Sequence, residues 1–266
     1  MMTLAGKWQN EFGSTMDLTV EDGIVQGVYT SSTGSSGEYR VIGFQQNGEP
    51  SSNGGQACAL AINWHSIVPG KPDNSWHWVS GLSGQLSIQD GGEQLVVAHA
   101  LVASVEFPDF AAAGTYIDKL IYKRISDESS HEPAEIDKSA AIDDPLVGNW
   151  YGADGTNLNI EQVIPFWNDA YKDGAFGIIF GLITWNGVAS QMYGVTDIHT
   201  GAPFNLDRKS VSIVALPDAD NGPAVSLAGT LDLRNKILNV LNLPSQATAP
   251  ANSYLQTTVS TKTFTQ

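Results

Sequence analysis

The chain has 266 residues, 42% of them hydrophobic, which is enough for one large domain or two small ones with cores of their own. It carries 13 Lys and Arg against 28 Asp and Glu, and the resulting formal charge of −15 repels phosphate backbones and anionic membranes. We therefore expect no nucleic-acid partner. The single cysteine, Cys58, excludes an internal disulfide. The sequence shows no signal peptide and no apolar run long enough to span a membrane, so we expect a soluble protein, secreted or cytoplasmic.

The first half of the chain consists of short runs rich in β-branched and aromatic residues, separated by Gly, Asn, Asp and Pro. These runs predict eight strands near residues 6–11, 15–20, 24–31, 38–46, 56–65, 75–83, 93–103 and 114–124. Eight sequential strands favour an up-and-down antiparallel barrel. Closure removes the exposed edge strands, and the interior of such a barrel is wide enough for one small ligand.

Alternation along each expected strand divides its side chains between the interior and the outside. On the first strand and the turn after it, the side chains that share one parity are Trp8, Asn10, Phe12 and Ser14. On the sixth, residues 75, 77 and 79 share a parity, and if they face inwards then Trp76 and Trp78 face outwards. An exposed tryptophan pair is typical of an interface between barrels.

Residues 126–145 have the composition of an exposed linker, with seven acidic residues, two prolines and several serines. They separate residues 1–125 from residues 146–266. The run that begins at Gly148 and contains Trp150 echoes the run that begins at Gly6 and contains Trp8. The sequence thus predicts an all-β protein with two eight-stranded antiparallel barrels joined by an acidic linker.

Four short motifs follow one another in the first half at the spacing of the expected strands. They are Gly6-x-Trp8-x-Asn10-x-x-Gly13-Ser14, Gly27-x-Tyr29-x-Ser31, Asn63-Trp64 and Ser80-Gly81. In this order they resemble the avidin and streptavidin family of biotin-binding barrels, over nearly the whole first half. The resemblance implies a non-catalytic protein that binds biotin or a similar small molecule as a ligand, has no cofactor, and forms homo-oligomers through its barrel faces.

The resemblance also implies a set of ligand-binding residues. The family's Asn, Ser and Tyr donors to the ureido oxygen of biotin match Asn10, Ser14 and Tyr29, and three neutral donors that converge on one oxygen stabilise charge there. Its acceptors for the ureido N–H groups match Ser31 and Asp118. The remaining implied contacts lie on the walls, the rim and the lid loop: Phe12, Thr33, Ser35, Trp64, Ser75, His77, Val79, His99, Leu101 and Phe110.

Several positions depart from the family pattern. Val79 and His99 stand where the family usually has aromatic residues, and each lost apolar wall lowers the expected affinity by about 1.5–3 kcal/mol. In the second half Gly152 takes the place of Asn10, and Lys262 takes the place of the acceptor aspartate. A glycine has no side-chain donor and an ammonium cannot accept a hydrogen bond. We therefore expect the second barrel not to bind biotin in the family manner.

Other functions stay open. A lectin-like or toxin-like interaction protein is suggested by the tryptophans expected at the surface, which are Trp76, Trp78, Trp167 and Trp185. An isomerase or cyclase would depend on Tyr29, Asp118 and the histidines. The expected strands place His77 and His99 apart and without a clear third ligand, which argues against a metal site. No nucleophile with its base, phosphate loop or zinc motif is present, so the sequence favours a binding protein over an enzyme.

Overall fold

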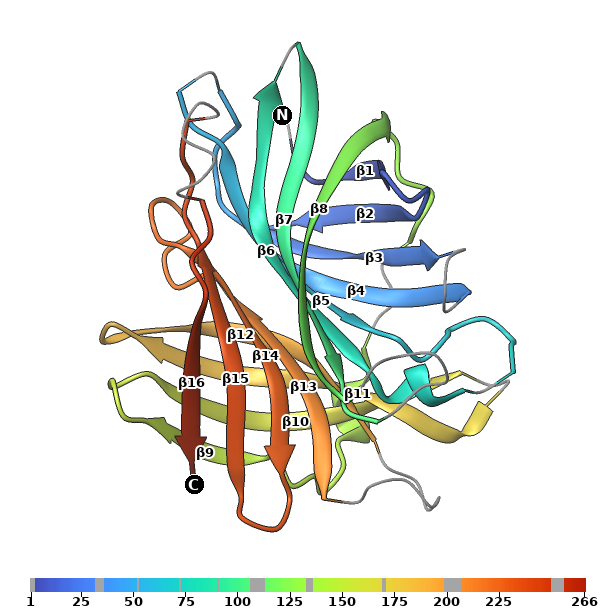
Figure 1. The fold of residues 1–266 in the computed structure, drawn as a ribbon, viewed down its shortest axis with the longest axis vertical. Coiled ribbons are helices and arrows are strands. Elements are labelled where there is room, and N and C mark those ends of the chain that lie inside the picture. Colours follow the sequence, from blue (N-terminus) through green and yellow to red (C-terminus); the bar gives the residue numbers. More distant parts are fainter. Residues whose placement is uncertain are drawn as a thin grey trace.

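The structure, a computed structural model, describes residues 3–31, 36–51, 53–71, 73–89, 91–105, 113–132, 136–168, 171–198, 207–249 and 256–266, with backbone only at 167–168 and 171–175. Eight strands close an antiparallel barrel in the N-terminal half (Figure 1). They are β1 (Gly6–Asn10), β2 (Thr15–Glu21), β3 (Ile24–Ser31), β4 (Gly37–Gln45), β5 (Gln56–Asn63), β6 (Val79–Gln89), β7 (Gly92–Ala103) and β8 (Gly114–Ser126). Each strand pairs with its sequence neighbour, and β1 closes the barrel against β8.

The C-terminal half forms a second closed barrel with the same strand order. Its strands are β9 (Gly148–Gly152), β10 (Asn157–Asn168), β11 (Tyr171–Trp185), β12 (Val188–Asp197), β13 (Arg208–Ala215), β14 (Ala224–Asp232), β15 (Ile237–Ser245) and β16 (Ser260–Thr265). The predicted all-β class with two eight-stranded barrels is confirmed. The helices in the described part are two short 3-10 turns, η1 (Asn74–His77) and η2 (Lys138–Ala140), and no described helix is long enough to cross a membrane.

A buried tryptophan fills one end of each barrel. Trp8 and Trp150 are fully buried, and their indole N–H groups donate to the carbonyl oxygens of Leu4 and Leu146 at 2.9 and 2.8 Å. Each packs among the apolar side chains of its own barrel interior. We call this the sealed end of each barrel, and the opposite end, where β1 or β9 finishes, the open end.

A third apolar core lies between the two barrels. The outward faces of β4 to β7 pack against those of β10 to β15 in one buried cluster. Phe44 stacks on Tyr193 with 5.0 Å between ring centroids, and a Cβ on Gly81 would lie only 2.4 Å from Ser226 Oγ. Glycine at this position therefore permits the close approach of β6 to β14. The two barrels form one packed unit.

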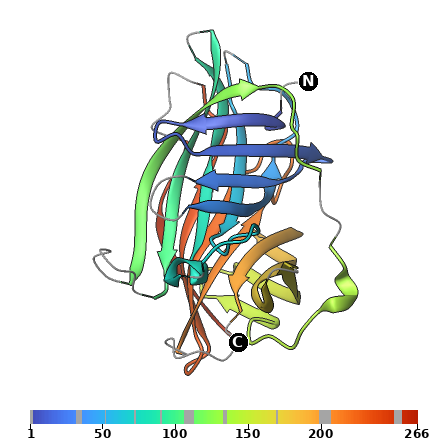
Figure 2. The same cartoon turned by 90° about the vertical axis from the view of Figure 1, so that its right-hand side faces the viewer.

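The barrels lie antiparallel, with the open end of each beside the sealed end of the other (Figure 1). At the sealed end of the first barrel, Gln46 Nε2 donates to the carbonyl oxygen of Gly222 at 2.6 Å. At its open end, His77 Nδ1 lies 2.9 Å from Asp197 Oδ1. The linker passes along the side of both barrels (Figure 2) and is fixed to each, because Ser130 donates to Asp17 of the first barrel and Ile142 forms an isolated β-bridge with Val163 of the second.

The expected strand at 75–83 is wrong over its first four residues. Asp73 accepts a hydrogen bond from the backbone N–H of Ser75 at 2.8 Å, which starts the η1 turn, so the strand begins only at Val79. The expected exposed tryptophan pair is also wrong, because Trp76 and Trp78 are only 7% and 6% exposed. One packs against the His65 ring at 3.9 Å between centroids, and the other lies at the open end of the first barrel.

Candidate ligand site

Uncharged polar side chains gather at the open end of the first barrel. Asn10 ends β1, and its Oδ1 accepts the backbone N–H groups of Phe12 and Ser14 at 3.1 and 2.9 Å. Asn10, Ser14 and Tyr29 are all buried. Tyr122 lies opposite Asn10 in the β1–β8 register, and burial raises its pKa well above the usual 10.0, with nearby Tyr29 adding to the rise. Its hydroxyl therefore stays protonated.

Aromatic rings stand beside this polar group. The Trp64 ring centroid lies 5.6 Å from that of Tyr29, edge to face, and 4.9 Å from that of Tyr39. Trp78 packs with Trp64 and Leu101, and its indole N–H donates to the carbonyl oxygen of Val105 at 3.0 Å. The open end thus combines polar with aromatic side chains, which is the composition of many small-molecule sites. We call Asn10, Ser14, Tyr29 and Tyr122 the polar floor, and the side with Trp64 and Trp78 the aromatic wall.

The side chain of Val79 does not face the barrel interior. It is fully buried in the core between the barrels, whereas Leu82 of the same strand belongs to the interior core. Because β6 starts after the η1 turn, the inward set on this strand is 80 and 82, and Trp78 precedes it on the same side. Val79 as a ligand contact was therefore wrong. Asp73, two residues before Ser75, is a capping signal in the sequence that indicates this shift.

A hydrogen-bond chain links three residues at the edge of the aromatic wall. Trp64 Nε1 donates to Ser80 Oγ at 2.8 Å, and Ser80 Oγ lies 2.8 Å from His99 Nε2. Burial lowers the pKa of His99 to about 4, although Asp118, opposite it in the β7–β8 register, acts in the other sense. His99 is therefore neutral at pH 7, and its Nε2 can accept a hydrogen bond from the Ser80 hydroxyl.

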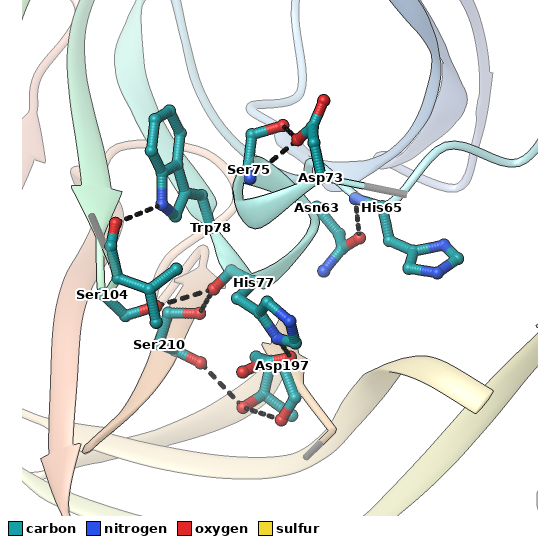
Figure 3. Close-up of polar contacts among 11 residues, drawn as sticks. Asn63, His65, Asp73, Ser75, His77, Trp78, Ser104, Asp197 and Ser210 are labelled. Carbon is teal, nitrogen blue, oxygen red and sulfur yellow. Dashed lines mark hydrogen bonds and ion pairs between the residues drawn. The ribbon is translucent and has the colours of Figure 1, made fainter. Parts of the chain in front are cut away.

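His77 is directed towards the second barrel, so its expected place in the ligand site is wrong. Its Nδ1 pairs with Asp197, and its carbonyl oxygen accepts hydrogen bonds from Ser104 and Ser210 at 2.8 and 2.5 Å (Figure 3). Burial alone would lower the pKa of His77, but the hydrogen bond and charge of Asp197 raise it above the ordinary 6.5. Ser75 is also buried in η1, and its hydroxyl donates to Asp73.

The structure brings most of the other expected ligand residues to one end of the barrel. These are Asn10, Ser14, Tyr29, Ser31, Trp64, His99, Leu101 and Asp118. Phe12 is 57% exposed on the β1–β2 turn and does not belong to the interior core. Thr33, Ser35 and Phe110 lie outside the described residues. Sequence reasoning missed Tyr39, Trp78, Ser80 and Tyr122, which alternation from Tyr29, Leu82 and Asp118 would have indicated once β6 was correctly placed.

Strand register identifies the matching positions in the second barrel. Trp150 and Ile183 both face Leu158, just as Trp8 and Tyr29 both face Met16. Ile183 therefore takes the place of Tyr29. By the same comparison, the pair Gly152 and Phe264 takes the place of Asn10 and Tyr122. The second barrel thus lacks these three polar groups of the first.

The register also corrects the expected place of Lys262. Asn242 faces Ser260 as His99 faces Asp118, so Ser260 and not Lys262 replaces the aspartate. Lys262 has the place of Leu120, and its side chain points into the barrel. Its ammonium donates to Asp154 and to Thr156 Oγ1 and lies 4.6 Å from the Trp185 ring centroid. A cation with its own carboxylate partner therefore occupies this open end.

No group of three or more His, Cys, Asp or Glu side chains in the described ranges could hold a metal ion. Residues 1–124 match the family model described as Avidin family. No curated protein matches the chain significantly. Among solved structures, xenavidin is similar at 21% identity, over 46% of this chain and 97% of that chain, with a TM-score of 0.37. The family match covers β1 to β7 and most of β8, and the N-terminal barrel is therefore similar to the avidin family, with a second closed barrel following it in tandem.

Proposed function

We propose that the N-terminal barrel binds biotin, or a small molecule with the same cyclic urea, without catalysing a reaction. The observation that carries the proposal is the buried trio Asn10, Ser14 and Tyr29 beside Trp64, at the open end of an avidin-family barrel. A ureido group is flat and uncharged, with one strong acceptor between two N–H donors. Neutral donors with acceptors at the rim suit it better than charged groups do.

The local hydrogen bonds prepare Asn10 for this role. Its Oδ1 is occupied by two backbone N–H groups, which fixes the plane of the amide. The amide nitrogen, which lies beside the Tyr122 hydroxyl, is then the group of this side chain that can donate to a ligand oxygen. Because the orientation of the amide is set before binding, less side-chain entropy is lost when the ligand binds.

The aromatic wall supports a higher affinity than the sequence suggests. The loss assigned to Val79 does not apply, because Trp78 packs beside Trp64 and Leu101 where a ring is needed. His99 is the one remaining polar substitution in the wall, and its neutral ring is hydrogen-bonded to Ser80. We therefore expect two tryptophan rings to enclose the apolar part of the ligand.

Three of the four tryptophans that suggested the interaction-protein alternative are not exposed. Trp76 and Trp78 are buried, and Trp185 is half-buried beneath the ammonium of Lys262. The side chain of Trp167 lies outside the described part of the chain. The biotin hypothesis is therefore the one that we test first.

Calorimetric titration of the full chain with biotin tests the proposal. Ser14→Ala should weaken binding by about tenfold because a buried ligand acceptor loses one donor. Thr156→Ala is the matched control, since the N–H of Gly152 donates to the Thr156 carbonyl just as that of Asn10 donates to the Ser14 carbonyl. It should leave the affinity unchanged. The absence of heat at millimolar biotin, or equal losses in the two variants, would contradict the proposal.

A further inference from the structure

The loop between β5 and β6 carries two of the aromatic rings of the candidate ligand site. It begins at Trp64 and ends at Trp78, and we call residues 64–78 the tryptophan loop. The N–H of Trp64 donates to the carbonyl oxygen of Trp78 at 3.1 Å, which ties the two ends together. Within the loop, the His65 and Trp76 rings are in contact at 3.9 Å between centroids. A displacement of the loop therefore moves both tryptophans of the site.

The second barrel forms hydrogen bonds with this loop at His77, the residue directly before Trp78. Asp197 Oδ1 lies 2.9 Å from His77 Nδ1, and Ser210 Oγ donates to the His77 carbonyl oxygen at 2.5 Å (Figure 3). Asp197 is fully buried at the end of β12, and Ser210 is fully buried in β13. Because the His77 carbonyl belongs to the peptide that leads into Trp78, contacts from the second barrel fix the direction in which Trp78 leaves the backbone.

The same kind of contact at the other end of the interface has different chemistry. Gln46 follows Gly43 by three residues, as Asp197 follows Gly194, and the register makes these two glycines equivalent. Gln46 donates through its amide to the backbone carbonyl of Gly222. At this end the contact from the matching position is therefore made by a neutral amide. Among the residues that the structure describes, a carboxylate–imidazole pair joins the barrels only at the end that holds the tryptophan loop.

We propose that Asp197 and Ser210 are positioning residues for the ligand site of the first barrel. The second barrel then acts as a built-in partner that holds Trp64 and Trp78 in place and so sets the affinity. This inference rests on the proposed function of the first barrel. It gives the second barrel a role although its own open end lacks the polar floor.

Biotin titrations of three full-length variants test the inference. Asp197→Ala should weaken binding by about tenfold, because a buried hydrogen bond between a carboxylate and a histidine is lost. Asp197→Asn should stay within about threefold of the wild type, because an amide oxygen still accepts from His77. Gln46→Ala is the control at the opposite end of the interface and should lower stability without changing affinity. Unchanged affinity in folded Asp197→Ala, or an equal loss in Gln46→Ala, overturns the inference.

A second measurement needs no ligand and separates failure of the inference from failure of the proposed function. The indole N–H signals of Trp64 and Trp78 in an NMR spectrum, assigned with Trp64→Phe and Trp78→Phe, report their hydrogen bonds to Ser80 and Val105. Asp197→Ala should shift both signals, Asp197→Asn should restore them, and Gln46→Ala should move neither. If the wild type binds no biotin, the proposed function fails. The indole signals alone then decide whether Asp197 positions Trp64 and Trp78.

Should Asp197→Ala fail to fold, Ser210→Ala replaces it. This variant removes one of the two hydroxyl donors to the His77 carbonyl and leaves Ser104 in place. It should shift the Trp78 indole signal more than the Trp64 signal, because His77 directly precedes Trp78. Unshifted indole signals in folded Ser210→Ala overturn the inference.

Discussion

The two barrels share their strand order, their register and a sealing tryptophan, but their open ends differ in chemistry. The matched positions are Asn10 and Gly152, Tyr29 and Ile183, and Tyr122 and Phe264. The second barrel closes without any of these polar groups. Such polar groups are therefore not required to close a barrel of this topology, which agrees with the ligand-binding role that we propose for them in the first barrel.

The largest expected effect is on the feature that the barrels have in common. Trp8→Ala and Trp150→Ala should each lower the free energy of unfolding by about 3–5 kcal/mol, because each leaves a large cavity at a sealed end. The loss should be greater for Trp8, whose ring also lies 4.2 Å from the Arg124 guanidinium. Urea unfolding followed by far-UV circular dichroism measures both.

A conservative pair provides the control for these two variants. Trp8→Phe and Trp150→Phe keep most of the apolar volume but remove the indole donors to Leu4 and Leu146, so they should cost less than the alanine variants. If one of the alanine variants left stability unchanged, the two sealed ends would not be equivalent. Trp8 and Trp150 could then not serve as the matched positions from which the registers of the two barrels are compared.

The second prediction concerns the contact between the barrels. Gly81→Val should destabilise the protein by about 1–3 kcal/mol, because the new side chain meets Ser226 and Ala228 of the facing strand. It should also divide thermal unfolding into two transitions, since the barrels would lose their common core. Gly92→Ala is the matched control, because the nearest atom to its added Cβ is Gln89 O at 3.8 Å. Calorimetry that shows one unchanged transition for Gly81→Val would contradict the packing described for β6 and β14.

The third prediction uses the difference between His99 and its counterpart Asn242, which does not titrate. The pKa of His99 in the folded state is about 4, below the ordinary 6.5, so the unfolded state binds the proton first as the pH falls. The stability that the neutral ring contributes is complete above pH 6.5 and is lost between pH 6.5 and 4. The slope reaches about 1.4 kcal/mol for each pH unit.

His99→Asn should remove this part of the acid sensitivity. His65, whose pKa is also lowered to about 4 by burial, remains in both proteins, so the difference between wild type and variant isolates His99. Urea unfolding at pH 7.0, 6.0 and 5.0 gives the two curves. The same pH dependence in both would show that the environment of His99 does not suppress its protonation.

Alternation and turn residues were sufficient to predict the first barrel, and they failed where a local hydrogen bond competed with them. Seven of the eight expected strands lie within two residues of the observed bounds, but the Asp73 side chain turned the start of the remaining one, the sixth, into η1. That shift displaced the inward set by one residue and led to Val79 in place of Trp78. Alternation places Asn10 and Ser14 on the same side as Trp8, whereas their role towards a ligand is implied by the family resemblance and stays a prediction.

The contact between the barrels left a weaker signal in the sequence. Strand β5 carries alternating alanines on its outward face and larger apolar residues on its inward face, a continuous apolar run that indicates burial on both sides. The partner of that face is more than a hundred residues away, so its identity depends on tertiary packing. The role of His77 could not be predicted for the same reason, because its partner Asp197 is brought near it only by the packing of the two barrels.

The smallest expected effect on stability, and the one that most sharpens the comparison, comes from Lys262→Leu, which gives the second barrel the residue that the first has at Leu120. Stability should change by no more than about 1 kcal/mol, because the ion pair with the largely exposed Asp154 contributes little. The pKa of Asp154, which the Lys262 hydrogen bond holds below 3.8, should rise towards that value, as NMR of the carboxyl carbon would show.

Biotin should still not bind at the second barrel of Lys262→Leu, because Gly152 and Ile183 supply no donor for a ureido oxygen. Calorimetric titration decides this through its stoichiometry, with Thr156→Ala in the same background as the control. If a second site per chain appeared, the charge of Lys262 alone would account for the difference between the barrels, and the polar floor of the first would not be what selects its ligand. A stoichiometry equal to that of the wild type keeps Asn10 and Tyr29 as the residues that distinguish the two.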